Sequence, residues 1–115
     1  MDSGQQLFAE RQRIISEMEN SKRRAYDNGK LLAETTTAYR MLLAQKILQL
    51  KAEGLQISII EKVAKGDEEV AQAEFEMMEA EALYKASNEN IQIMKLELKC
   101  VQADIEREYP AGKNI

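Results

Sequence analysis

The sequence predicts an all-α fold: a long antiparallel helical hairpin of coiled-coil type with a short connecting helix, which we expect to assemble into an oligomeric bundle. Two long stretches carry apolar and small residues at helical spacing. One break, bracketed by Gly54 and Gly66, separates them. We therefore expect a single helical domain over residues 1–115. Its helices are expected at about 4–52, 58–65 and 67–109.

The first helix has a start signal and a stop signal. Ser3 and Gln6 fit an S-x-x-Q capping box. Lys51 falls in the expected last turn, where a cation suits the helix dipole, and Gly54 is placed to end the helix. Between these signals, the residues that recur at about 3.6 residues per turn are Leu7, Ile14, Met18, Ala25, Leu32, Tyr39, Leu43, Ile47 and Leu50.

The middle of the first helix is its weakest part, because its inward face carries only small residues there: Ser21, Ala25, Gly29 and Thr36. Glycine costs about 1 kcal/mol relative to alanine inside a helix. These small residues either let the two backbones approach closely, with Ile91 filling the space, or allow the helix to bend or fray near Gly29. We favour close packing.

The connecting helix and the last helix also carry capping signals. Ser58 and Glu61 form a second capping box, for a short helix that ends at Gly66. Its apolar residues predict a hydrophobic plug at the end of the hairpin. A likeness to the second helix of a helix-turn-helix is weaker, because no basic recognition face follows. Asp67 is placed to cap the last helix, and Pro110 to end it.

The last helix carries a heptad seam that is held for five repeats. Its steps alternate three and four residues, which places every member on one narrow helical face. The seam residues are Val70, Ala73, Met77, Ala80, Tyr84, Ser87, Ile91, Met94, Leu98, Val101 and Ile105.

Pairing the ends of the two long helices predicts a register in which facing residue numbers sum to about 120. This register places Arg40, Lys46 and Lys51 beside residues 67–81, a segment with seven carboxylates and no Lys or Arg. We call this segment the acidic run. Opposite charges on adjacent helices help select partner and direction.

A second apolar strip lies outside the seam of the last helix. One partner helix cannot cover both strips, so something else must do so. The strip is either the interface of a self-associated bundle or, in part, the docking surface for a foreign partner. The expected interface residues are Phe75, Met78, Leu83, Ile93 and Leu96, and the strip also holds Ala86 and Cys100.

The composition excludes most reactive constellations. The chain has no His, which removes Ser-His-Asp and Cys-His pairs and His-ligated zinc. It has no glycine-rich phosphate-binding motif. Cys100 has no second Cys to pair with, and its helical neighbours Leu96 and Ala103 favour a buried structural thiol. We expect no catalytic residue, no metal ligand and no cofactor.

Two charged surfaces are candidates for partner binding. The basic cluster, Lys22, Arg23 and Arg24, is a possible nucleic-acid contact, but the acids Glu19 and Asp27 interrupt it and favour a solvated face. The second surface would act as a decoy that occupies the basic groove of a nucleic-acid-binding protein. It consists of Glu74, Glu76, Glu79 and Glu81.

Three short motifs carry a resemblance to a known group of proteins: LKAEG at 50–54, AKGDEEVA at 64–71 and LYKA at 83–86. Over roughly residues 40–109, the chain resembles small helical proteins of bacteriophages and prophages of Gram-positive bacteria. Those proteins are often encoded near genes for single-strand-annealing recombinases and single-strand-binding proteins. The resemblance implies a virus-encoded protein that works in DNA metabolism or in evasion of host defence. It transfers no functional residues.

We expect a non-enzymatic phage accessory protein that binds itself and another protein. Its target would be a nucleic-acid-handling protein, such as a host defence nuclease or a recombination protein. Alternatives are direct nucleic-acid binding through the basic cluster and a structural role in virion assembly. The chain has no apolar run of roughly 18 residues, and its first residues lack the apolar core of a signal peptide. We expect no membrane association and a cytoplasmic location, in the host cell if the protein is viral.

Overall fold

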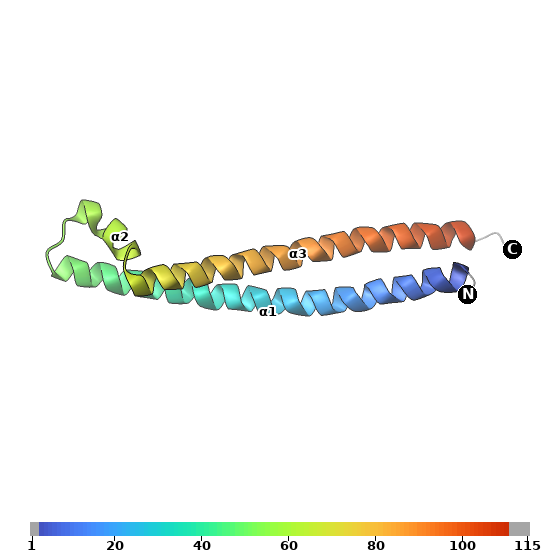
Figure 1. The fold of residues 1–115 in the computed structure, drawn as a ribbon, viewed down its shortest axis with the longest axis horizontal. Helices are drawn as coiled ribbons and strands as arrows, with labels where there is room; N and C mark the ends of the chain where they lie inside the picture. Colours follow the sequence, from blue (N-terminus) through green and yellow to red (C-terminus); the bar gives the residue numbers. More distant parts are fainter. Residues whose placement is uncertain (1–2, 111–115) are drawn as a thin grey trace. The chain divides into compact units, whose positions relative to one another are not determined.

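The structure is a computed structural model that describes residues 3–110, which form three α-helices and no strand. The predicted all-α fold with a short connecting helix is confirmed (Figure 1). The helices are α1 (Ser3–Ala52), α2 (Ile57–Lys65) and α3 (Glu68–Glu108).

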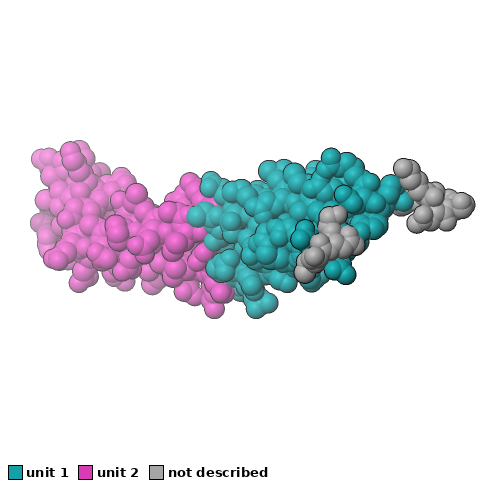
Figure 2. Space-filling model, turned by 45° about the vertical axis from the view of Figure 1, so that its right-hand side comes forward, with its two compact units in different colours: residues 1–26, 86–115 teal, residues 27–85 magenta. Residues whose placement is uncertain are grey.

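The chain divides into two compact units, shown in different colours in Figure 2. Unit 1 combines Met1–Tyr26 with Ala86–Ile115, and unit 2 is Asp27–Lys85. In each unit, a segment of α1 lies antiparallel to a segment of α3, as the predicted hairpin requires.

The predicted seam of α3 forms the core of both units. In unit 1, Ile14 is 1% exposed and packs with Met18 and Met94, and Leu98 and Val101 pack against this cluster. All eleven seam residues of α3 are buried or half-buried. Full burial of an aliphatic side chain stabilises the fold by about 1.5–3 kcal/mol, so the seam is the main source of cohesion between α1 and α3.

Helix α1 ends at Ala52, and Gly54 terminates it as predicted. Gly54 has φ +86°, a backbone conformation that favours glycine. Its N–H donates to the Lys51 carbonyl at 3.1 Å, and the Leu55 N–H donates to the Leu50 carbonyl at 3.1 Å. These two bonds form a Schellman motif, and Leu55 packs in the same cluster as Leu50.

Helix α2 packs one face against the end of α1 in unit 2. Ile60 and Ala64 are buried in a cluster with Leu50, and Leu43 and Ile47 pack against it. The predicted hydrophobic plug is therefore only partly formed in unit 2: Ile60 and Ala64 are buried, whereas Ile59 and Val63 are exposed.

The predicted capping box at Ser58 is wrong. Helix α2 begins at Ile57, so Ser58 lies inside the first turn, and Gln56 occupies the N-cap without a side-chain cap hydrogen bond. Burial of Ile60 against Leu50 positions α2, and tertiary packing of this kind overrides a local capping signal. The capping box expected at Ser3 involves a side chain that lies outside the described residues.

Helix α3 begins as predicted, with Asp67 as its cap. The Val70 N–H donates to Asp67 Oδ2 at 3.4 Å, which satisfies one of the first backbone donors of the helix. Glu68 and Glu69 occupy the first turn, where the helix dipole favours anions.

The register between α1 and α3 differs from the predicted one. In unit 1, the Arg11 guanidinium reaches the Gln102 side chain, and in unit 2 Lys46 pairs with Asp67. The residue numbers of each pair sum to 113 rather than to about 120. The difference is one heptad, and a slip of one heptad keeps the same residues on the seam. Hydrophobic pattern alone therefore does not separate the two registers.

The middle of α1 is closely packed, as favoured from the sequence, but by a different partner. In unit 2, a Cβ added at Gly29 would lie 3.1 Å from Cε1 of Tyr84, so the tyrosine ring lies directly over the glycine. Helix α1 is continuous through Gly29. The expectation that Ile91 fills this space is wrong, because the register places Tyr84 there.

Candidate protein-binding surface

The outer face of α3 in unit 2 exposes large apolar side chains. Phe75 and Met78 lie about one turn apart and are 60% and 57% exposed, and Leu83 is also exposed. The seam residues on the opposite side of the helix, including Val70 and Ala80, are buried. This is the second strip expected from the sequence, and its role as an interface stays a prediction.

Carboxylates surround this apolar face. Among the seven of the acidic run, Asp67 pairs with Lys46 at 3.2 Å and Glu81 pairs with Lys85 at 3.1 Å. The other five form no ion pair within the described residues, and four of these five are exposed. The four exposed carboxylates, which we call the acidic face, are Glu68, Glu69, Glu76 and Glu79.

Glu74, which we predicted to belong to the acidic surface, has a different environment. It is half-buried and accepts a hydrogen bond from Tyr39 of α1, and this bond is the main reason that the pKa of Tyr39 is raised. Glu81 is exposed but paired, so of the four predicted acidic-surface residues only Glu76 and Glu79 belong to the acidic face.

The acidic run pairs less with α1 than the predicted register implied. Lys46 forms the expected ion pair, but Arg40 and Lys51 form none in the part of the chain that the structure describes. The one-heptad shift accounts for Lys51, because α3 begins beside Lys46 and not beside the last turn of α1. Among residues 3–110, most carboxylates of α3 in unit 2 therefore form no ion pair.

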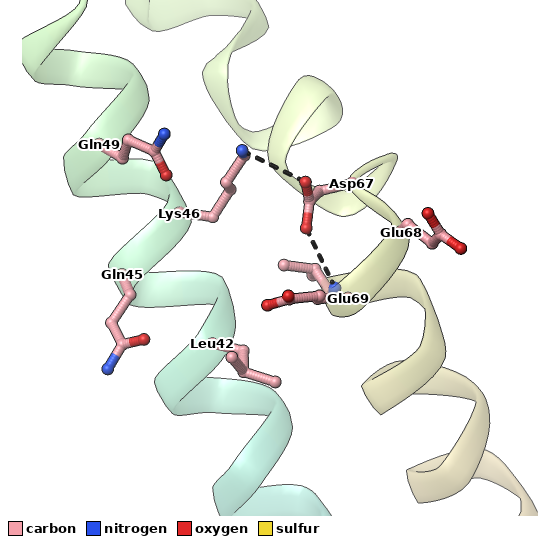
Figure 3. A pocket seen from close by; sticks show the side chains of 8 residues that line it. Leu42, Gln45, Lys46, Gln49, Asp67, Glu68 and Glu69 are labelled. Atoms are coloured by element: carbon pink, nitrogen blue, oxygen red, sulfur yellow. Dashed lines mark hydrogen bonds and ion pairs between the residues drawn. The ribbon is translucent and has the colours of Figure 1, made fainter.

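A polar pocket of about 370 Å³ lies where α3 begins (Figure 3). Lys46 extends across it to the Asp67 carboxylate, and Gln45 and Gln49 line the α1 side. The Lys46 hydrogen bond is the main reason that the pKa of Asp67 is lowered, with a smaller contribution from the Val70 N–H. The pocket thus holds an internal ion pair and helix cap, which join α3 to α1.

Among residues 3–110, no group of three or more Cys, Asp or Glu side chains is close enough to hold a metal ion.

The outer face of α3 in unit 1 is also apolar and exposed. Ile93 and Leu96 are 54% and 63% exposed. Together with Cys100 they line a shallow groove that also includes Arg13 and Glu97. The two lysines on this part of α3, Lys95 and Lys99, are exposed.

The predicted burial of Cys100 is wrong, because its thiol is exposed. Its helical neighbours Leu96 and Ala103 are exposed as well. Apolar neighbours imply burial only when another element covers them, and these residues belong to the strip and not to the seam.

The basic cluster lies on α1 in unit 1, and its three side chains are exposed. Lys22 pairs with Glu19 at 3.6 Å, and Arg24 donates to the Ser21 hydroxyl at 3.1 Å. Two of the three cations are therefore engaged with neighbours on their own helix.

One polar network was not anticipated from the sequence. The Ser21 hydroxyl is buried and accepts from Arg24 and from Asn90 Nδ2, at 3.1 and 3.2 Å, and it lies 3.5 Å from Met94 Sδ. A hydroxyl offers one donor and two acceptor positions, so this serine is fully satisfied. In the sequence, this network is indicated by a small residue, Ser21, on the seam. Its partners could not be predicted, because they depend on the register.

No helix within residues 3–110 combines the length and the apolar character needed to cross a membrane.

Comparison with known proteins gives no match, whether to a family model, to a curated protein sequence or to a solved structure.

Proposed function

We propose that this chain is a non-enzymatic interaction protein that binds and modulates a nucleic-acid-handling protein, with the outer face of α3 in unit 2 as its docking surface. The observation that carries the proposal is the combination of exposed Phe75 and Met78 with the acidic face around them.

The chemistry of this surface indicates a basic partner. Exposed apolar side chains supply the area that a protein interface buries. Carboxylates without cations of their own favour a partner rich in Lys and Arg and speed the encounter with it. Proteins that bind nucleic acid carry such basic grooves to contact phosphates. The chain would occupy the groove as a decoy.

The resemblance to phage proteins gives this proposal its setting. Proteins of that kind are often encoded near recombination genes, which would place this chain inside a bacterial cell, in DNA metabolism or in evasion of host defence. We therefore propose a host defence nuclease or a recombination protein as the class of target. The absence of His and of phosphate-binding motifs from the sequence favours binding over catalysis.

A pull-down with the full chain tests this proposal. The bait is used in a nuclease-treated lysate of a Gram-positive bacterium, and captured proteins are identified by mass spectrometry. The test variant reverses the acidic face, E68K/E69K/E76K/E79K. The matched control changes the net charge equally at exposed carboxylates outside α3, E19K/D27K/E34K/E53K.

We expect the wild type and the control to retain the same nucleic-acid-handling protein and the acidic-face variant to lose it. Retention of that protein by the acidic-face variant would contradict the docking surface. Capture of no nucleic-acid-handling protein by the wild type would contradict the function.

Direct nucleic-acid binding is the second candidate, and the exposure of Lys22, Arg23 and Arg24 favours it. Salt-sensitive retention of single-stranded DNA by the wild type, lost in K22E/R23E/R24E, would support direct nucleic-acid binding. A role in virion assembly would instead place the protein in purified particles.

A further inference from the structure

Unit 2 carries a second exposed apolar face, on α1. Met41 and Leu48 lie one heptad apart and are 58% and 66% exposed. The small residues Thr37 and Ala44 share their side of the helix and are exposed as well. We call these four residues the outer face of α1. The residues of α1 that pack with α2 lie on another side of the helix.

The charges of α1 in unit 2 are opposite to those of α3. Between positions 35 and 52, α1 holds Arg40, Lys46 and Lys51 and no carboxylate. Lys46 pairs with Asp67, whereas Arg40 and Lys51 are exposed and form no ion pair within residues 3–110. Unit 2 therefore offers an acidic apolar face on α3 and an apolar face on a basic segment of α1.

We infer that the outer face of α3 in unit 2 binds the outer face of α1 in unit 2 of a second copy. Unit 2 alone supplies both faces. Because the two faces differ, the contact is heterologous, and each end of a bound pair keeps one free face. Contacts of this kind build rings or open chains of copies rather than two-fold dimers. The foreign partner proposed above would compete with the second copy for the outer face of α3.

Side-chain size selects an antiparallel register in which facing residue numbers sum to 119. Large side chains then meet small ones on either side of a central methionine pair. The facing pairs, with the residue of the second copy named second, are Phe75 with Ala44, Met78 with Met41, and Ala71 with Leu48. Antiparallel registers one heptad away place Met78 opposite Glu34 or Phe75 opposite Lys51, which leaves one anchor without an apolar partner.

The same register joins opposite charges at both ends of the contact. Glu68 faces Lys51 of the second copy. Lys85, which pairs with Glu81 in its own chain, faces Glu34 of the second copy. A parallel arrangement of the same two faces would place Glu68 opposite Glu34, and Lys85 opposite Lys51. Because like charges brought together destabilise a complex, charge favours the antiparallel direction.

Mixing two blocked variants tests the inference, because a heterologous contact needs only one intact face from each copy. F75Q/M78Q removes the anchors of α3, and M41Q/L48Q removes those of α1. Glutamine is a good helix former and all four side chains are exposed, so both variants are expected to keep the fold, which circular dichroism checks.

Sedimentation velocity of the full chain measures the assemblies. We expect wild-type oligomers that grow with concentration. Each blocked variant alone should be monomeric, because its self-association is weakened at least about a hundredfold. An equimolar mixture of the two should form a heterodimer and nothing larger, since the two faces left in the pair are both blocked.

Charge reversal tests the register in the same assay. E68K and K51E are each expected to weaken association about fivefold. E68K/K51E restores the opposite charges between copies and is expected to associate like the wild type. The matched control, E19K/K22E, exchanges an exposed ion pair within unit 1 and should change nothing.

Disulfide formation tests the register separately, in a C100S background. Thr37 and Ala82 are exposed, and the register places them opposite each other in two copies. T37C/A82C is therefore expected to form a ladder of covalent oligomers on mild oxidation. T37C/A71C has an equally exposed cysteine on α3 but should form none, because a disulfide requires Cα atoms within about 7 Å.

Four results would overturn the inference: a wild-type monomer at concentrations of roughly 100 μM, no heterodimer in the mixture, no recovery in E68K/K51E, or no disulfide in T37C/A82C. M41Q/L48Q separates this inference from the foreign partner. It loses self-association but keeps the whole outer face of α3, so it should still capture a foreign partner. Each proposal therefore fails by its own result.

Discussion

Substitution of Gly29 by alanine tests how α1 and α3 meet in the middle of the hairpin. Alanine gains about 1 kcal/mol over glycine in a helix interior. The added Cβ would lie 3.1 Å from Cε1 of Tyr84, closer than ordinary van der Waals contact. Displacing the ring costs about 1 kcal/mol. The two effects offset each other, so we expect G29A to change the free energy of unfolding by less than about 0.5 kcal/mol.

Removal of the Tyr84 ring separates the helix-propensity gain of G29A from the cost of displacing the ring. Y84A alone should cost about 2 kcal/mol, because the side chain is half-buried. In the Y84A background, G29A should stabilise the protein by about 1 kcal/mol, which gives a coupling energy of about 1 kcal/mol between the two positions.

Urea unfolding followed by circular dichroism at the helical band measures all four variants. The matched cycle uses I91A, since position 91 would face Gly29 in the register first predicted from the sequence, and it should give no coupling. Equal effects of G29A in the wild type and in Y84A would refute the contact. Coupling to I91A instead would refute the register.

Further predictions concern the core, the helix end and the cap. I14A should lower the free energy of unfolding by about 3 kcal/mol, because the Ile14 side chain is 1% exposed. I15A lies on the exposed side of the same helix and should lower it by less than about 1 kcal/mol; urea unfolding measures both. G54A should cost about 1 kcal/mol because φ is +86°, while G66A, where φ is −81°, should be tolerated in the same assay. The lowered pKa of Asp67 means that its carboxylate stabilises the fold fully above its unfolded pKa of about 3.8, and that this contribution disappears as the pH falls through the folded value. The pH dependence of unfolding between about pH 2 and 5 should therefore be shallower in D67N than in the wild type.

The seam was predictable because helical periodicity is a local property of the sequence. The spacing of Val70, Ile91 and Ile105 fixes which side of α3 each residue occupies, and all three are buried. The same reasoning held for Gly54 and Asp67, since a positive φ and an N-cap carboxylate act within one helical turn.

The register was not predictable from the same pattern, because registers one heptad apart bury the same residues. In the structure, one of the two registers is selected by contacts that depend on the size and length of side chains. Tyr84 fits over Gly29, and Lys46 reaches the cap of α3. The packing of α2 against the end of α1 displaces the start of α3 along α1. The charge argument identified Lys46 correctly, and it included Lys51 only because it assumed a tighter connection.

For the candidate site, the sequence predicted which residues lie off the seam, but it did not predict which of them are exposed to solvent. Periodicity placed Phe75, Ile93 and Leu96 off the seam, and they are exposed. It could not show whether anything covers that side, and so Cys100 was predicted to be buried on the strength of its neighbours.

Because periodicity does not show what covers this surface, its charges say more about the partner than its apolar residues do. Apolar residues on an outer face are compatible with any apolar partner. Carboxylates constrain the choice, because like charges brought together destabilise a complex. Glu76 and Glu79 are exposed, so they would favour a partner that brings Lys or Arg, such as the basic groove proposed above.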